Sequence, residues 1–155
     1  MALKRIVILG STGSIGRSAL SVASHLQGEV KVTGLAAGSN AKALWRQALA
    51  VKPAWLALQD VSGAAWLSAQ VRKQKSWKPK VLGGPDALTQ LAAQAPADIV
   101  LTAVVGSVGL KPTLAAIEKG RHIALANKET LVAAGELVSA AARRRKVSLL
   151  PVDSE

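Results

Sequence analysis

The sequence predicts an α/β protein with a Rossmann-like, doubly wound and mostly parallel sheet that carries helices on both faces. Two observations predict this fold. Buried-strand patterns alternate with amphipathic helix patterns along the whole chain, and a glycine-rich turn follows the first strand. Strands that alternate with helices form parallel sheets through right-handed crossovers, so each helix covers one face of the sheet.

The expected elements follow one another in order. We expect strands at 6–9, 30–36, 54–58, 81–82, 97–105, 122–126 and 147–152. We expect helices at about 15–26, 41–50, 64–73, 86–94, 113–119 and 129–145. Asn40 and Asp60 suit helix N-caps, and Gly120 suits a helix C-terminus.

Length and composition exclude several classes of protein. The chain has 155 residues, of which 50% are hydrophobic, so it is not disordered. No apolar run is long enough to cross a membrane, and no signal-peptide pattern is present. The chain has no cysteine, which excludes disulfides, thiolate metal sites and a cysteine nucleophile. We expect a cytoplasmic, bacterial protein.

The formal net charge of +11 raises nucleic acid as a possible partner. The basic residues are scattered, however, except for the run at 143–146, which closes a helix pattern where cations suit the helix dipole. Phe and Tyr are absent, so little aromatic surface is available for stacking on bases. We expect no nucleic acid and attribute part of the charge to phosphate-bearing small ligands.

The segment around which the chain is organised is the glycine turn after the first strand. Its glycines, at three-residue spacing, are Gly10, Gly13 and Gly16. Glycines allow a tight turn and close approach of a ligand, and a helix N-terminus attracts phosphate. Hydroxyl donors are added by Ser11, Thr12 and Ser14. An ordinary strand–helix turn is the alternative, but the strand before and the helix after favour a dinucleotide pyrophosphate site.

The end of the second strand favours NADP over NAD. An NAD site places a carboxylate there for the ribose 2′-hydroxyl, and residues 36–40 contain none. Ser39 and Asn40 can donate hydrogen bonds to a 2′-phosphate, and Lys42 or Arg46 can supply charge. The alternative role of Ser39 and Asn40, a helix cap, is compatible with this one.

Polar residues also follow the strand expected at 122–126. Lys128 can hold a phosphate or a developing oxyanion, and Asn127 and Glu129 can bind a ribose or nicotinamide. The alternative is that Asn127 caps a helix and Glu129 lies in its first turn.

The chain ends with carboxylates directly after a buried strand. Asp153 and Glu155 alternate on an extended segment, so both side chains point the same way. Such a pair suits a divalent metal or general acid–base chemistry, and a merely polar chain end is the alternative. Because ligand residues occupy this edge of α/β sheets, we expect the front portion of a longer enzyme.

Four motifs together resemble the 1-deoxy-D-xylulose 5-phosphate reductoisomerase family. They are GSTGSIG at 10–16, AGSN at 37–40, LANKETLV at 125–132 and LLPVDSE at 149–155. The resemblance implies an NADPH-binding domain at 1–150 and the truncated start of a catalytic, metal-binding domain at 151–155. It implies an enzyme of the non-mevalonate route to isoprenoids that uses NADPH and a divalent metal (Mg, Mn or Co). Its reaction converts 1-deoxy-D-xylulose 5-phosphate to 2-C-methyl-D-erythritol 4-phosphate.

The resemblance also implies residue roles. The cofactor pyrophosphate would be bound by the turn that begins at Gly10, through Thr12, Gly13, Ser14 and Ile15. The adenosine 2′-phosphate would be surrounded by Gly38, Ser39 and Asn40, and the nicotinamide end would be contacted by Asn127 and Glu129. Substrate would be bound by Lys128, Ser154 and Glu155, the metal by Asp153 and Glu155, and the catalytic residues would be Lys128, Asp153 and Glu155.

Many family members carry a lysine at the position of Ser39, and we expect Lys42 or Arg46 to compensate. The family's third carboxylate ligand and its carboxyl-terminal domain lie beyond Glu155, so we expect this chain to bind NADPH without turning over the phosphorylated sugar. The family forms homodimers, largely through parts absent here. The alternatives are the front domain of another NADP-linked dehydrogenase, which the PVDSE ending argues against, and a non-enzymatic nucleotide-binding module.

Overall fold

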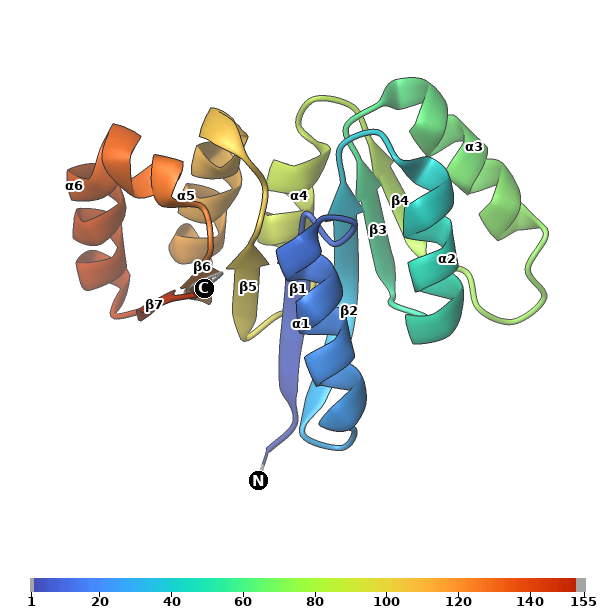
Figure 1. Cartoon of the computed structure of the whole chain (residues 1–155), viewed down its shortest axis with the longest axis horizontal. Coiled ribbons are helices and arrows are strands. Elements are labelled where there is room, and N and C mark those ends of the chain that lie inside the picture. Colours follow the sequence, from blue (N-terminus) through green and yellow to red (C-terminus); the bar gives the residue numbers. More distant parts are fainter. Residues whose placement is uncertain (1, 153–155) are drawn as a thin grey trace.

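The computed structural model, which describes residues 2–152, is built on a seven-stranded sheet with strand order β4-β3-β2-β1-β5-β6-β7 (Figure 1). Every neighbouring pair of strands is parallel. The strands are β1 Lys4–Leu9, β2 Val30–Ala37, β3 Trp55–Leu58, β4 Lys80–Gly83, β5 Ile99–Thr102, β6 His122–Leu125 and β7 Leu149–Pro151. The strand order reverses between β1 and β5, as in doubly wound folds, and the predicted fold class is confirmed.

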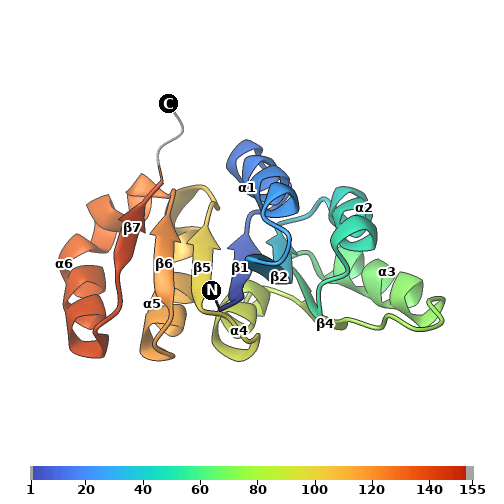
Figure 2. The same ribbon diagram turned by 90° about the horizontal axis from the view of Figure 1, so that it is seen from below.

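Helices cover both faces of the sheet. They are α1 Ser14–His25, α2 Ala41–Val51, α3 Val61–Arg72, α4 Ala87–Gln94, α5 Leu110–Glu118 and α6 Lys128–Arg145, with a short 3-10 helix, η1, at Gly106–Gly109. Figure 2 shows α1 and α2 on one face and α4, α5 and α6 on the other. None of the helices in the described part of the chain is both long and apolar enough to span a membrane.

The central strands are apolar without alternation because both of their faces are buried. Val7 and Leu9 pack into the core beneath α4, α5 and α6, whereas Ile8 packs into the core beneath α2 and α3. All three side chains are fully buried. Burial of one such side chain contributes about 1.5–3 kcal/mol, so β1 anchors both halves of the core.

Local sequence signals set most element boundaries. Asn40 Oδ1 accepts a hydrogen bond from the Ala43 amide at 3.1 Å, and Asp60 Oδ2 accepts one from the Gly63 amide at 2.8 Å. Gly120 follows α5 with φ +74°, a conformation that glycine adopts without strain. The two predicted N-caps and the predicted helix C-terminus are therefore confirmed.

Several elements differ from the sequence prediction, among them helices α3 and α5, which each begin three residues before the expected position. Strand β5 is shorter than the expected 97–105, because the chain leaves the sheet after Thr102 and turns into η1. Strand β7 is likewise shorter than 147–152. Helix α6 is kinked at Ala134, where φ is −149°, directly before Gly135, a residue that favours helix poorly.

The apolar residues of α1 are unevenly covered: Ile15 and Ala19 are half-buried against the core, whereas Val22 is exposed. Val22 is 57% exposed, and it lines a groove of about 470 Å³ together with Leu101 of β5 and Ala124 of β6. In Figure 2 no helix from the described part of the chain lies on the sheet face beside α1, over β5 and β6. The helix expected at 15–26 is therefore present, but its apolar side chains are only partly covered by the core.

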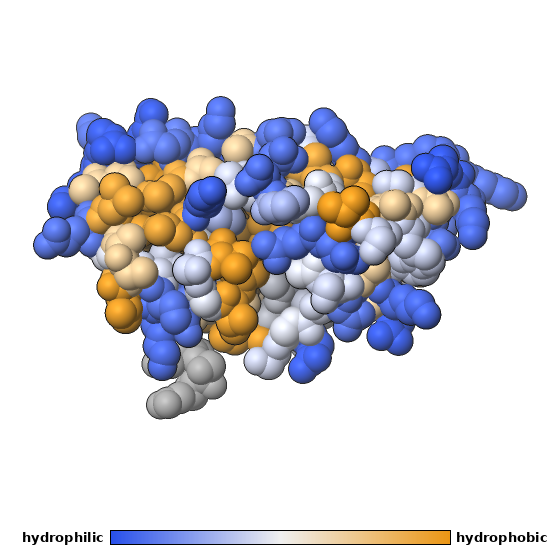
Figure 3. All heavy atoms as spheres, turned by 90° about the horizontal axis from the view of Figure 1, so that it is seen from above, coloured by the Kyte–Doolittle hydropathy of each residue, from blue (hydrophilic) through white to orange (hydrophobic). Residues whose placement is uncertain are grey.

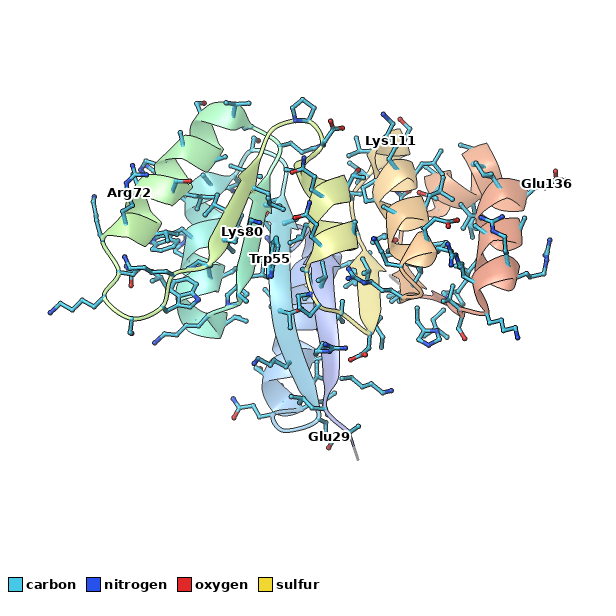
Figure 4. All side chains as sticks on the ribbon, turned by 180° about the vertical axis from the view of Figure 1, so that it is seen from behind. Glu29, Trp55, Arg72, Lys80, Lys111 and Glu136 are labelled. Carbon is cyan, nitrogen blue, oxygen red and sulfur yellow. The ribbon has the colours of Figure 1, made fainter. Side chains whose placement is uncertain are left out.

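Charged groups stabilise the periphery. On the outer strands, the Lys80 ammonium lies over the Trp55 ring, 4.8 Å from its centroid (Figure 4). At the amino edge of the sheet, Asp98 accepts hydrogen bonds from the backbone and the guanidinium of Arg5. These bonds lower the pKa of the Asp98 carboxyl to about 2. The Arg5–Asp98 pair thus joins the start of β1 to the start of β5, opposite the edge considered next.

Candidate functional site

The predicted site segments gather at one edge of the sheet. Parallel strands all end at the same edge, so the segments after β1, β2, β5 and β6 converge there. Figure 3 looks onto this edge from above and shows apolar side chains gathered among hydrophilic ones. Val105 and Val132, which follow β5 and β6, are 85% and 86% exposed.

The glycine turn is pressed against the end of β5. Gly10 has φ +86°, and a Cβ at Gly10 would lie 2.5 Å from the carbonyl oxygen of Ala103. A Cβ at Gly16 would overlap the carbonyl oxygen of Gly10, so a glycine at this position lets α1 pack closely against the turn. The first and third glycines are therefore required by the fold itself.

Gly13 differs, because nothing in the described chain requires a glycine there. It is the N-cap residue of α1, with no side-chain capping bond, and a Cβ on it would meet only the Gly10 carbonyl oxygen, at 3.6 Å. Gly13 and Ser14 are exposed, and Ile15 is half-buried. The N-terminus of α1 is thus open to an anion, which could approach the backbone of Gly13 without meeting a side chain.

Ser11 is not a ligand donor, contrary to the sequence prediction. Its side chain is fully buried, and its hydroxyl donates to Gln47 Oε1 at 2.8 Å. Its amide donates to the Ala36 carbonyl. Arg17, which the sequence analysis did not single out, instead brings an exposed cation to the turn and donates to the Thr12 carbonyl at 3.3 Å.

Residues 38–40 form an exposed corner between β2 and α2. Asn40 uses Oδ1 as the helix cap, which leaves its amide nitrogen as a donor. Lys42 and Arg46 are exposed on α2. Asp60, at the end of the neighbouring β3, directs its carboxylate to the Gly63 amide and the Ser62 hydroxyl. The corner itself therefore carries no carboxylate that would repel an anion.

The β6–α6 junction borders a cavity of about 380 Å³. The cavity is lined by Ile15 of the glycine turn and by Asn127, Lys128 and Glu129. It therefore spans the point between β1 and β5 where the strand order reverses. Lys128 and Glu129 are exposed, whereas Asn127 is 3% exposed. The corner at 38–40 is not part of this cavity.

Asn127 occupies the N-cap position of α6, but its side chain does not cap the helix. Its Nδ2 donates to the Gly106 carbonyl at 2.8 Å and so holds η1 in place. Its Oδ1 is buried without a partner among the described residues, as is the hydroxyl of Thr130. Unpaired buried polar atoms are costly and are often found where a ligand or ordered water completes the bonding.

Comparison with known proteins identifies the family. Residues 6–135 match the family model of 1-deoxy-D-xylulose 5-phosphate reductoisomerase. The chain belongs to this family. A 1-deoxy-D-xylulose 5-phosphate reductoisomerase from Symbiobacterium thermophilum is 52% identical over 153 residues, which cover 98% of this chain and 40% of the relative. The chain thus spans about two fifths of the length of the curated relatives it matches.

Solved structures of reductoisomerases share the fold. The enzyme from Zymomonas mobilis in complex with NADPH is 38% identical, with a TM-score of 0.90 over 99% of this chain and 40% of that one. A reductoisomerase in complex with NADPH, fosmidomycin and magnesium is 34% identical, with a TM-score of 0.90 over 96% of this chain and 36% of that one.

The metal-binding residues that the reductoisomerase resemblance implies lie outside the described residues. These are Asp153 and Glu155, together with the substrate residue Ser154. Between residues 2 and 152, no group of three or more His, Asp or Glu side chains is placed to hold a metal. Pro151 and Val152, which precede Asp153 in sequence, line the same cavity as Lys128.

Proposed function

We propose that this chain is the NADPH-binding portion of a 1-deoxy-D-xylulose 5-phosphate reductoisomerase. The observation that carries the proposal is the open N-terminus of α1 at the point where the strand order reverses. Its N-cap residue is Gly13, and the fold itself does not require a glycine there. The acid-free corner at 38–40 selects the phosphorylated cofactor. Solved relatives that bind NADPH support this choice.

The cofactor would lie across the carboxyl edge of β1. Its pyrophosphate would meet the α1 N-terminus, at Thr12, Gly13, Ser14 and Ile15 of the turn that begins at Gly10. Its 2′-phosphate would meet the corner formed by Gly38, Ser39 and Asn40. Its nicotinamide end would enter the cavity beside Asn127 and Glu129, where the buried Asn127 Oδ1 accepts no hydrogen bond from the described residues.

Substrate and metal would bind next to the nicotinamide end. Lys128 is exposed at the cavity, where its ammonium can hold a phosphate or stabilise a developing oxyanion. Asp153 and Glu155 offer the hard carboxylate oxygens that Mg²⁺ or Mn²⁺ prefers, and Ser154 adds a hydroxyl for substrate. When bound, the metal would polarise the substrate's hydroxyl and carbonyl oxygens as a Lewis acid.

In this proposal residues 1–150 form the NADPH-binding domain and residues 151–155 begin the catalytic one. The full-length enzyme would convert 1-deoxy-D-xylulose 5-phosphate to 2-C-methyl-D-erythritol 4-phosphate, as a cytoplasmic homodimer. Residues 1–155 taken alone would bind NADPH without turning over substrate, because Asp153 and Glu155 without further ligands would hold a metal weakly.

Calorimetric titration of the 155-residue chain with NADPH and, separately, with NADH tests the proposal. We expect NADPH to bind at least about tenfold more tightly, a difference of about 1.4 kcal/mol. Equal affinities would contradict the 2′-phosphate site at 38–40. Binding of neither cofactor would contradict the dinucleotide site itself.

A further inference from the structure

Ser11 and Gln47 exchange two hydrogen bonds across the site. The Ser11 hydroxyl donates to Gln47 Oε1, and Gln47 Nε2 donates to the Ser11 carbonyl, both at 2.8 Å. Ser11 is fully buried and Gln47 is half-buried, so water competes little for these bonds. The pair joins the glycine turn to α2, 36 residues further along the chain.

Ser11 is fixed from three directions. Its amide donates to the Ala36 carbonyl of β2 at 2.9 Å. Its Cα lies against the backbone of Gly16 in α1, where no Cβ would fit. Gln47 supplies the third contact, from α2. Of these three contacts, the one to Gln47 is made by a side chain and can be removed without disturbing the backbone.

Gln47 also lies on the helix that begins at the proposed 2′-phosphate corner. It comes seven residues after the N-cap Asn40, about two helical turns away and on the same face. The backbone amides of Gly10 and Ser11 already tie the glycine turn to Ala36 of β2, at 2.9 Å each. Because a helix of this length moves as a rigid unit, the bonds from Gln47 to Ser11 add a second tie, which holds α2 and the corner at its start at a fixed distance from the turn.

We propose that Gln47 is a positioning residue that presets the spacing between the pyrophosphate subsite and the 2′-phosphate subsite. The inference rests on the function proposed above. A ligand that touches both subsites gains affinity when their spacing is fixed in advance, because less conformational freedom is lost on binding. A ligand that touches one subsite gains nothing from the spacing.

The test compares a two-subsite ligand with a one-subsite ligand. Gln47→Met keeps the side-chain length and removes both hydrogen bonds. Calorimetry should show that NADPH binds about five- to tenfold more weakly to this variant, whereas adenosine 2′-monophosphate binds within about twofold of its wild-type affinity. Gln90→Met, the same replacement at an exposed position on α4, should change neither affinity.

Ser11→Ala provides a second, milder variant, which keeps the bond from Gln47 Nε2 and removes only the hydroxyl bond. We expect NADPH affinity to fall about two- to threefold, again with adenosine 2′-monophosphate unchanged. Both ligands losing affinity alike would show general loosening of the site and would overturn the proposal. Unchanged NADPH affinity in both variants would also overturn the positioning role of Gln47. If the wild-type chain still prefers NADPH in that case, the proposed function would hold without the positioning role.

Discussion

The carbonyl oxygen of Ala103 lies so close to Gly10 that a Cβ on Gly10 would be 2.5 Å from it. This contact joins the turn after β1 to the end of β5, at the point where the strand order reverses. The proposed cofactor site lies directly beyond it. The same backbone contact therefore supports the fold and borders the proposed site. The three glycines have separable roles: Gly10 and Gly16 are required by the fold, whereas Gly13 faces the proposed cofactor.

Gly10→Ala should destabilise the protein. The methyl group would overlap the Ala103 carbonyl, and φ of +86° is strained for alanine. We expect the free energy of unfolding to fall by about 2–3 kcal/mol, measured by urea denaturation. A stability equal to that of the wild type would show that the turn and the end of β5 are not in contact.

Gly13→Ala should leave the fold intact and weaken cofactor binding. Its methyl group would meet only the Gly10 carbonyl oxygen, at 3.6 Å, so the midpoint of urea denaturation should hardly move. If the pyrophosphate rests on this backbone, the methyl group occupies its place, and NADPH affinity should drop more than about tenfold in a calorimetric titration. Unchanged affinity would place the pyrophosphate elsewhere.

Ser39→Lys should strengthen NADPH binding selectively. Ser39 is exposed at the acid-free corner, and an added ammonium there would pair with the 2′-phosphate. We expect NADPH affinity to rise about three- to tenfold and the gain to shrink in high salt, with NADH affinity unchanged. Ser76→Lys adds the same charge on the loop before β4 and serves as the control. An equal gain from both variants would indicate general electrostatic attraction.

The Arg5–Asp98 pair should make stability depend on acid pH. Hydrogen bonds from Arg5 lower the pKa of Asp98 from 3.8 to about 2. The pair therefore contributes fully above the unfolded-state pKa, and its contribution is lost as the pH falls through 3.8 toward 2.

The measurement is urea denaturation between pH 6 and pH 2. Asp98→Asn should lower the free energy of unfolding at pH 6 by roughly 1 kcal/mol, a figure reduced for the partial exposure of the pair. The difference from the wild type should shrink toward pH 2. A difference that stays constant over this range would mean that ionisation of Asp98 does not stabilise the fold.

Local signals made most of the fold and part of the site predictable. The glycine turn, the caps at Asn40 and Asp60 and the C-terminal glycine at Gly120 are each specified within a few residues of sequence. The strand at β1 was recognisable because burial on both faces leaves a continuous apolar run.

Contacts between distant residues were not predictable. The sequence indicates Ser11 as a ligand donor because its partner Gln47 is 36 residues away. It likewise indicates Asn127 as a helix cap, although its side chain binds Gly106, 21 residues earlier. Val104 and Val105 look like strand residues, yet the chain leaves the sheet after Thr102. Such errors fall where tertiary contacts compete with local preference.

The measurement that tests the proposed site most directly is mapping of amide chemical shifts in the ¹⁵N-labelled chain during titration with NADPH. We predict that the largest changes fall at the glycine turn, at the corner 38–40 and at Asn127–Glu129, with the far end of the α1 groove, at Val22, Ala23 and Leu26, unaffected. Changes confined to that far end, or no changes at saturating NADPH, would contradict an NADPH site at the carboxyl edge of the sheet.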